Sequence, residues 1–190
     1  VKNTIALGVN SKSSAENATA LGLGANASAN DTVAIGTNAA ASAINGLALG
    51  INSKSLSGNA VAIGLRSEAA GTDSIAIGFI AKTSDVNAIA LGNQATASKA
   101  NTIALGTQTK AAGANAIALG NQADASVFQA IALGTSAKAS AADTVALGTG
   151  SIASGNSAIA LGNKAQALGS NSISIGKGNI VSGKNSAAIG

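Results

Sequence analysis

A six-residue motif, Asn-Thr-Ile-Ala-Leu-Gly at residues 101–106, recurs with small changes throughout the chain. Its final glycine occurs every 14 residues without insertion or deletion, so that the 190 residues hold fourteen copies. These glycines are Gly8, Gly22, Gly36, Gly50, Gly64, Gly78, Gly92, Gly106, Gly120, Gly134, Gly148, Gly162, Gly176 and Gly190. An internal repeat of this regularity predicts a fold of stacked, near-identical units rather than an ordinary globular domain.

The motif contains the alternation of a β-strand. A Leu or Ile precedes every motif glycine, and a second large aliphatic residue stands two positions earlier in twelve copies, with Ala or, once, Ser between them. Large-small-large alternation is typical of a strand that buries one face. We therefore expect Ile103 and Leu105 to point into a core, and Ala104 to point away from it.

The rest of each repeat predicts a second strand and two tight turns. Residues three and five after the glycine are mostly Ala, Ser or Thr, such as Thr109 and Ala111, and we expect them to face the aliphatic residues of the first strand. Fourteen residues are too few for a three-sided β-helix, whose coil needs about eighteen. The expected fold is thus all-β, a flattened parallel β-roll (a solenoid) of fourteen coils stacked about 4.8 Å apart.

Composition limits the chemistry. The chain has no His, Cys, Tyr, Trp, Met or Pro and only two Phe, so disulfides, thiolate metal sites and the usual nucleophile–base pairs are excluded. The net charge of +4 is spread along the sequence. Without a basic run or aromatic residues for base stacking, this charge argues against nucleic-acid binding. We expect no cofactor and no metal.

The chain shows no signal peptide and no membrane span. It begins inside a repeat and stops on a motif glycine. We interpret residues 1–190 as a single β-roll that is a fragment of a longer repetitive protein, with any targeting signal, stalk or anchor outside it.

The alanines that stand between the two large aliphatic residues of each motif suggest a docking surface. If Ile103 and Leu105 point into the core, the alanines form an apolar stripe on the outside of the first strands, where solvent-exposed positions usually carry polar side chains. We predict an interface with further copies of the chain at Ala62, Ala76, Ala90, Ala104, Ala118 and Ala132.

Two polar columns are further candidates. Lysines stand four after the glycine in alternate coils, with Glu68, Thr96 and Asp124 between them. They form either a basic ligand-binding ladder or, as we favour, an ion-pair ladder on a solvated face. The candidate ligand-binding residues are Lys54, Lys82, Lys110 and Lys138.

The second polar column begins each first strand and is mostly Asn, with Asp at three positions that include Asp31 and Asp73. Side chains that stack or bond to the turns explain this column better than metal ligation does. Phe79 and Phe128 are expected at corners, where local packing explains them better than partner binding does.

The motifs at 101–106 and 73–78 (Asp-Ser-Ile-Ala-Ile-Gly) resemble the head repeats of trimeric autotransporter adhesins of the YadA type. That family repeat has a Ser three residues after the glycine. Here Ser11, Ser53, Ser67 and Ser151 match it, and other coils have mostly Ala or Thr. The resemblance implies a left-handed roll and a homotrimer displayed from the outer membrane of a Gram-negative bacterium. It also implies non-enzymatic adhesion to extracellular matrix, cells, solid surfaces or other bacteria.

Two other functions fit the sequence less well. Residues 105–109 also resemble one turn of the hexapeptide acyltransferases, but the coil length differs and those enzymes use a histidine base, which this chain lacks. An ice-binding solenoid needs a flat array of Thr in register, whereas Thr is scattered here. We therefore predict an adhesive head that binds through repeated weak contacts.

Overall fold

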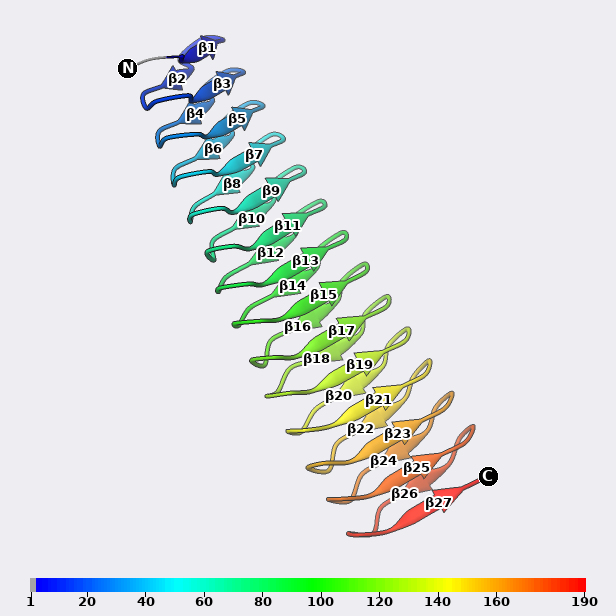
Figure 1. The fold of residues 1–190 in the computed structure, drawn as a ribbon. Coiled ribbons are helices and arrows are strands. Elements are labelled where there is room, and N and C mark those ends of the chain that lie inside the picture. The colour runs from blue at the N-terminus through cyan, green and yellow to red at the C-terminus, as the bar shows by residue number, and fades with distance from the viewer. Residues whose placement is uncertain (1–2) are drawn as a thin grey trace. The chain divides into compact units, whose positions relative to one another are not determined.

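The computed structural model describes residues 3–190, and within that range it consists of β-strands and turns without a helix. It divides into two compact units, Val1–Ala95 and Thr96–Gly190. Each unit is a parallel β-solenoid in which every coil contributes one strand to each of two sheets (Figure 1). The predicted all-β solenoid with a 14-residue coil is therefore confirmed.

In the first unit, three-residue strands form one sheet and two-residue strands form the other. The longer strands are β1 (Ile5–Leu7), β3 (Thr19–Leu21), β5 (Val33–Ile35), β7 (Leu47–Leu49), β9 (Val61–Ile63), β11 (Ile75–Ile77) and β13 (Ile89–Leu91). The shorter strands are β2 (Lys12–Ser13), β4 (Asn26–Ala27), β6 (Ala40–Ala41), β8 (Lys54–Ser55), β10 (Glu68–Ala69) and β12 (Lys82–Thr83).

The second unit has the same organisation. Its longer strands are β15 (Ile103–Leu105), β17 (Ile117–Leu119), β19 (Ile131–Leu133), β21 (Val145–Leu147), β23 (Ile159–Leu161), β25 (Ile173–Ile175) and β27 (Ala187–Ile189). Its shorter strands are β14 (Thr96–Ala97), β16 (Lys110–Ala111), β18 (Asp124–Ala125), β20 (Lys138–Ala139), β22 (Ile152–Ala153), β24 (Gln166–Ala167) and β26 (Ile180–Val181).

Strand register places equivalent residues of neighbouring coils side by side. In β15 and β17, for example, Ala104 pairs with Ala118 and Leu105 with Leu119. Within each unit, a column of the sequence repeat is therefore a row of aligned side chains on the molecule, as the sequence predicts.

The core contains small side chains, and here the predicted orientation is wrong. Ala104 and Ala118 are fully buried, as are Thr109 and Ala111 on the facing sheet, whereas Leu119 is 43% exposed. The two sheets are joined by corners of a few residues, and in most coils every position that points between them is Ala, Ser or Thr. Ile and Leu are too large for this narrow space and point outward. Near the C-terminal end of the chain, Val181 is also buried in this core.

Hydroxyl groups in this thin core bond to nearby carbonyl oxygens. Thr102 Oγ1 donates to the Lys99 carbonyl at 2.6 Å, and Thr109 Oγ1 donates to the Gly106 carbonyl at 2.8 Å. Both acceptors lie three residues earlier, at a corner. Burying a hydroxyl without a partner is costly, so these bonds make Ser and Thr compatible with core positions that are Ala in other coils.

The corners depend on left-handed backbone conformations. The motif glycine has a positive φ, which is 126° at Gly106, and a Cβ added there would lie 2.8 Å from the Gly120 carbonyl oxygen of the next coil. The Asn column is also left-handed, with φ of 57° at Asn101 and 58° at Asn115. Asn adopts this conformation more readily than most residues, which explains its use at this corner.

The Asn column forms side-chain ladders. Asn45 Nδ2 donates to Asn59 Oδ1 at 2.8 Å, and Asn59 Nδ2 donates to Asp73 Oδ1 at 2.7 Å. Asn17 donates to Asp31 in the same way at 2.9 Å. The predicted stacking of these side chains is confirmed.

Candidate functional site

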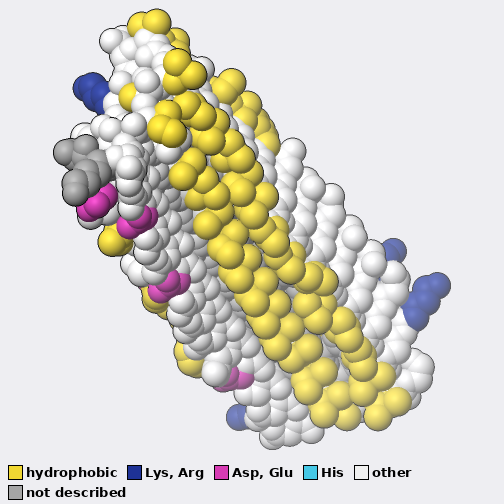
Figure 2. Space-filling view, turned by 45° about the horizontal axis from the view of Figure 1, so that its top comes forward, with side chains coloured by type: hydrophobic (Ala, Val, Ile, Leu, Met, Phe, Trp, Pro, Cys, Tyr) yellow, Lys and Arg dark blue, Asp and Glu magenta, His cyan; other side chains and the backbone are white. Residues whose placement is uncertain are grey.

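The most extensive functional candidate is a face of exposed aliphatic side chains on the longer strands. It comprises the two residues that flank the central residue of each longer strand, such as Ile117 and Leu119 on either side of the buried Ala118 in β17. We call this surface the aliphatic face. Figure 2 shows its side chains in yellow, gathered in rows over the longer strands. Leu49 and Ile77 in the first unit and Leu147 and Ile173 in the second are all more than a third exposed.

Rows of exposed Ile and Leu are costly in water, because burying one such side chain contributes about 1.5–3 kcal/mol. Contiguous apolar patches of this kind mark surfaces that another molecule covers. The charged residues lie outside these rows, since the two flanking positions are Ile, Leu, Val, Thr or Ala in every copy. The aliphatic face therefore has the composition of the centre of a protein interface.

The alanines expected to form this surface are on the same strands, but their side chains point into the core. Their side chains are fully buried between the two sheets and are unable to touch another chain. The prediction that they line an interface is wrong for Ala62, Ala76, Ala90, Ala104, Ala118 and Ala132. The apolar surface itself exists on the same strands, but it is formed by the aliphatic residues on either side of each alanine.

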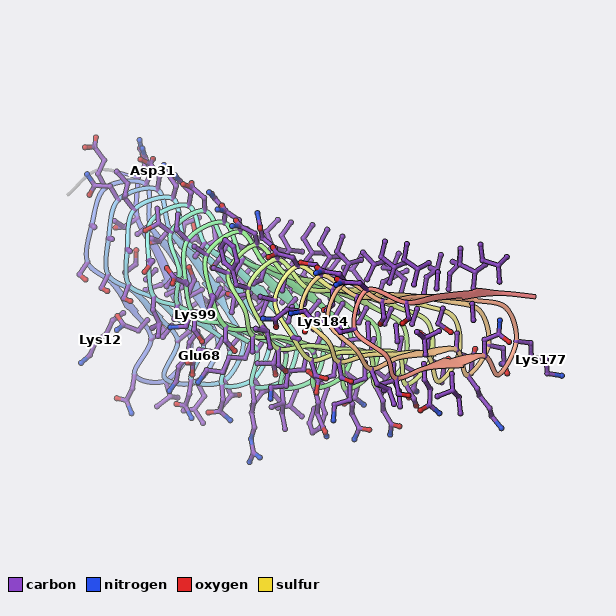
Figure 3. The ribbon with its side chains drawn as sticks, turned by 90° about the horizontal axis from the view of Figure 1, so that it is seen from below. Lys12, Asp31, Glu68, Lys99, Lys177 and Lys184 are labelled. Atoms are coloured by element: carbon purple, nitrogen blue, oxygen red, sulfur yellow. The ribbon has the colours of Figure 1, made fainter. Side chains whose placement is uncertain are left out.

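The candidate lysines do point outward, as predicted. Lys54 and Lys82 in the first unit and Lys110 and Lys138 in the second are exposed on the shorter strands. Lys12, in the same column, extends away from its coil (Figure 3). These ammonium groups are accessible to an acidic ligand.

Register also pairs these lysines with acids. Glu68 stands opposite Lys54 on one side and Lys82 on the other, and Lys82 Nζ lies 3.0 Å from Glu68 Oε1. In the second unit, Asp124 stands between Lys110 and Lys138 and accepts a hydrogen bond from Ser126 Oγ. The Lys82–Glu68 pair supports the ion-pair interpretation for that part of the column, and such exposed pairs contribute little stability.

The first unit also has a hollow beside this ion pair. It is lined by Asn52, Lys54, Arg66, Ser67 and Glu68. Arg66, the only arginine of the chain, occupies the left-handed position two after the motif glycine with φ of 58°. The hollow combines two cations with one carboxylate that is already paired to Lys82.

The acidic residues of the Asn column serve as hydrogen-bond acceptors. Asp31 and Asp73 each accept from the amide of the preceding coil, as described above. Among residues 3–190, no three His, Cys, Asp or Glu side chains are grouped as metal ligands.

Both Phe79 and Phe128 lie at corners and are exposed, at 39% and 49% respectively.

Comparison with protein families identifies the repeat. The model of the YadA head domain repeat, which spans two copies, matches eight segments that together cover almost the entire sequence. These are residues 2–25, 13–39, 41–67, 69–95, 97–123, 128–151, 153–179 and 169–190. The chain belongs to the YadA head family. The resemblance predicted from the sequence is thus confirmed.

YadA-like heads are the adhesin portions of trimeric autotransporters, generally without enzymatic activity and exposed at the extracellular surface. A comparison with curated proteins gave no match. In the part of the chain that the structure describes, no helix is long and apolar enough to cross a membrane.

Proposed function

We propose that this chain is the non-enzymatic adhesive head of a homotrimeric bacterial surface protein. Three copies pack through their aliphatic faces, and the shorter strands face outward as the adhesive surface. The observation that carries this proposal is the aliphatic face itself, because a YadA-type repeat with rows of exposed Ile and Leu needs a covering partner. Each copy coils in the left-handed sense of the family, and an anchor outside residues 1–190 holds the head at the outer membrane.

Assembly would bury the large side chains that the narrow core excludes. In each copy the small residues would fill the coil interior, and the Ile and Leu rows of three copies would fill the centre of the trimer. This arrangement provides the hydrophobic burial that a single coil of 14 residues lacks.

Adhesion would proceed through many weak contacts. The outward columns repeat once per coil and carry mostly short side chains, without the Trp and Tyr that dominate strong single contacts. Repetition along the coil, three copies per head and many heads per cell would raise the effective concentration of these contacts. Suitable partners are extracellular matrix proteins, host cells, other bacteria and solid surfaces. The Lys54, Lys82, Lys110 and Lys138 column would contribute attraction to acidic partners.

Sedimentation and a binding panel test the proposal together. The isolated chain should sediment as a trimer, and it should bind at least one matrix protein or plain surface when immobilised densely. Binding should fall steeply when the heads are immobilised sparsely, because separate heads lose multivalency. A monomer at all concentrations would refute the assembly. Tight binding that is independent of density, or turnover of a substrate, would refute the adhesive mechanism.

The lysine column needs a control with the same net charge. A variant with Lys54, Lys82, Lys110 and Lys138 changed to Gln should lose attachment to acidic matrix components. The matched variant changes four lysines outside that column, Lys99, Lys164, Lys177 and Lys184, to Gln and should retain more attachment. Equal losses in both variants would show that net charge, rather than the column, attracts the partner.

A further inference from the structure

The residue directly after the motif glycine is mostly apolar in the first unit and polar throughout the second. In the first unit it is apolar and exposed in five coils, where the side chains are between 39% and 70% exposed. We call these residues the corner row: Val9, Leu23, Ile51, Leu65 and Phe79. Thr37 and Asn93, the latter in the last coil of the first unit, are the exceptions. From residue 93 onward the same position is polar in every coil: Asn93, Thr107, Asn121, Thr135, Thr149, Asn163 and Lys177.

The fold itself does not require apolar residues at this corner. The coils of the second unit make the same turn after the glycine with Thr, Asn or Lys, which are exposed. In both units the residue two after the glycine, such as Asn52 or Gln122, is left-handed, with φ of 56° and 57°. Because the backbone is the same, the corner row adds exposed apolar surface without a structural benefit to the single chain.

The corner row continues the aliphatic face around one edge. In β9, for example, Val61 and Ile63 belong to the face, and Leu65 follows across the motif Gly64. The apolar surface of the first unit is therefore three columns wide along most of its length, and none of the three columns contains a charged residue. Figure 2 shows a further yellow row beside the aliphatic face near the N-terminal end.

The opposite edge of the face is polar. There each strand is preceded by the Asn column, whose amides are bonded to one another, as in the ladder from Asn45 through Asn59 to Asp73. The aliphatic face of the first unit is thus bordered by apolar side chains on one edge and by amide and carboxylate groups on the other.

We propose that a second copy of this chain covers the corner row, so that the first unit contributes a wider interface between copies than the second unit does. The inference rests on the proposed trimer. In a closed cyclic assembly each copy presents one edge to one neighbour and a different edge to the other. The apolar edge of one copy lies against the aliphatic face of the next, and the continuity of these two surfaces is what identifies a copy of the chain as the occupant.

The chain offers a matched pair of triple variants. The test variant is Leu23→Asn, Ile51→Thr and Leu65→Asn, which introduces residue types that the second unit already uses at this corner. The control variant is Leu56→Asn, Leu168→Asn and Ile180→Thr, which makes the same chemical changes at exposed apolar residues outside the corner row and the aliphatic face. Neither variant replaces a buried residue.

Sedimentation over a dilution series provides the first readout. In the test variant, the concentration at which trimers dissociate should rise about tenfold or more, because each of three copies loses apolar contacts. In the control it should stay within about twofold of the parent. A parent that is monomeric throughout would refute the proposed trimer itself. A trimeric parent whose test variant dissociates at an unchanged concentration would overturn only the corner-row inference.

Thiol labelling provides a second readout, because the chain contains no cysteine. A Leu65→Cys variant should react slowly with a maleimide when trimeric and faster after dilution to monomer. A Leu56→Cys variant should react at the same rate in both states. Equal reactivity of Cys at position 65 in trimer and monomer would overturn the inference. So would protection that appears only after a matrix protein or an apolar surface is added, because the occupant would then be an external partner.

Discussion

Ala118 and Leu119 are neighbours in β17, yet the Ala118 side chain is fully buried and the Leu119 side chain is 43% exposed. Ala118 stacks in register on Ala104 and Ala132 inside the coil, while Leu119 lies on the aliphatic face. The two residues therefore have opposite roles, one in the fold of the single chain and one on its outer surface.

Enlarging the buried residue should damage the fold. Ala118→Leu inserts three carbon atoms between two sheets that accommodate only small side chains at this level. We expect the monomer to lose about 3 kcal/mol or more of unfolding free energy, at the upper end of the range for overpacked cores. Urea denaturation at concentrations below trimer formation measures this loss. Unchanged stability would show that the space between the sheets is wider than the buried alanines indicate.

Charging the exposed residue should spare the fold and prevent assembly. Leu119→Lys places an ammonium group where solvent already reaches, so the circular dichroism and urea midpoint of the monomer should remain close to those of the parent. The same group would be unpaired and buried in the centre of a trimer, so the variant should sediment as a monomer. Lys138→Leu, which changes the opposite side of the coil, is the control and should remain trimeric. A trimeric Leu119→Lys variant would exclude the aliphatic face as the interface.

The sequence predicts the coil but leaves the orientation of its faces open. The 14-residue period, the stacking of identical columns and the outward lysines follow from residue spacing. Alternation of period two has two possible phases, and burying Ile103 and Leu105 rather than Ala104 is the wrong one. The hydrophobicity of Ile and Leu favours burying them, but the space between the two sheets is too narrow for their side chains.

A signal for the correct phase is present in the columns. The positions equivalent to Thr102, Ala104, Thr109 and Ala111 are Ala, Ser or Thr in almost every coil, and all four of these residues are fully buried. Four columns of uniformly small side chains on the two facing sheets fit a narrow core. A column of large side chains facing a column of small ones does not. The partner of the aliphatic face does not follow from the sequence, because periodicity identifies an apolar surface and not its occupant.

The motif glycine should be irreplaceable for two reasons that can be separated. At Gly106 an added Cβ would lie 2.8 Å from the Gly120 carbonyl oxygen, which is a steric clash. The substituted residue would also have to adopt a φ of 126°, which strains the backbone of any residue with a Cβ. Gly178 has φ of 72°, and an added Cβ there meets no atom within 4 Å. We expect Gly106→Ala to cost about 3 kcal/mol or more and Gly178→Ala about 1–2 kcal/mol, since only the first combines a clash with strain. Equal losses in thermal or urea unfolding would mean that the close approach of coils has no energetic effect.

Ile80 occupies a conformation that its side chain disfavours. Its φ is 54°, in the left-handed region, where a β-branched residue is rare, and the equivalent residues Asn52 and Gln94 have φ of 56°. Ile80→Asn should stabilise the monomer by about 1 kcal/mol, because Asn tolerates this region and the Ile side chain is partly exposed. The reciprocal change Asn52→Ile should destabilise it by a similar amount. Urea midpoints that move in the opposite directions would show that apolar contacts of Ile80 outweigh its backbone strain.

Ser172 should be improved by removing its hydroxyl. Its Oγ is buried and has no hydrogen-bond partner, whereas the equivalent Ser74 Oγ donates to the Gly71 carbonyl at 2.6 Å and accepts from Thr83 Oγ1 at 2.9 Å. Ser172→Ala should raise the unfolding free energy by about 1 kcal/mol, because it removes an unpaired polar group from a position that is Ala in other coils. Ser74→Ala should lower the unfolding free energy by about 1–3 kcal/mol, because it also leaves the Thr83 hydroxyl unpaired. Urea unfolding measures the unfolding free energy of both variants. If Ser172→Ala loses as much stability as Ser74→Ala, the Ser172 hydroxyl is hydrogen-bonded in solution.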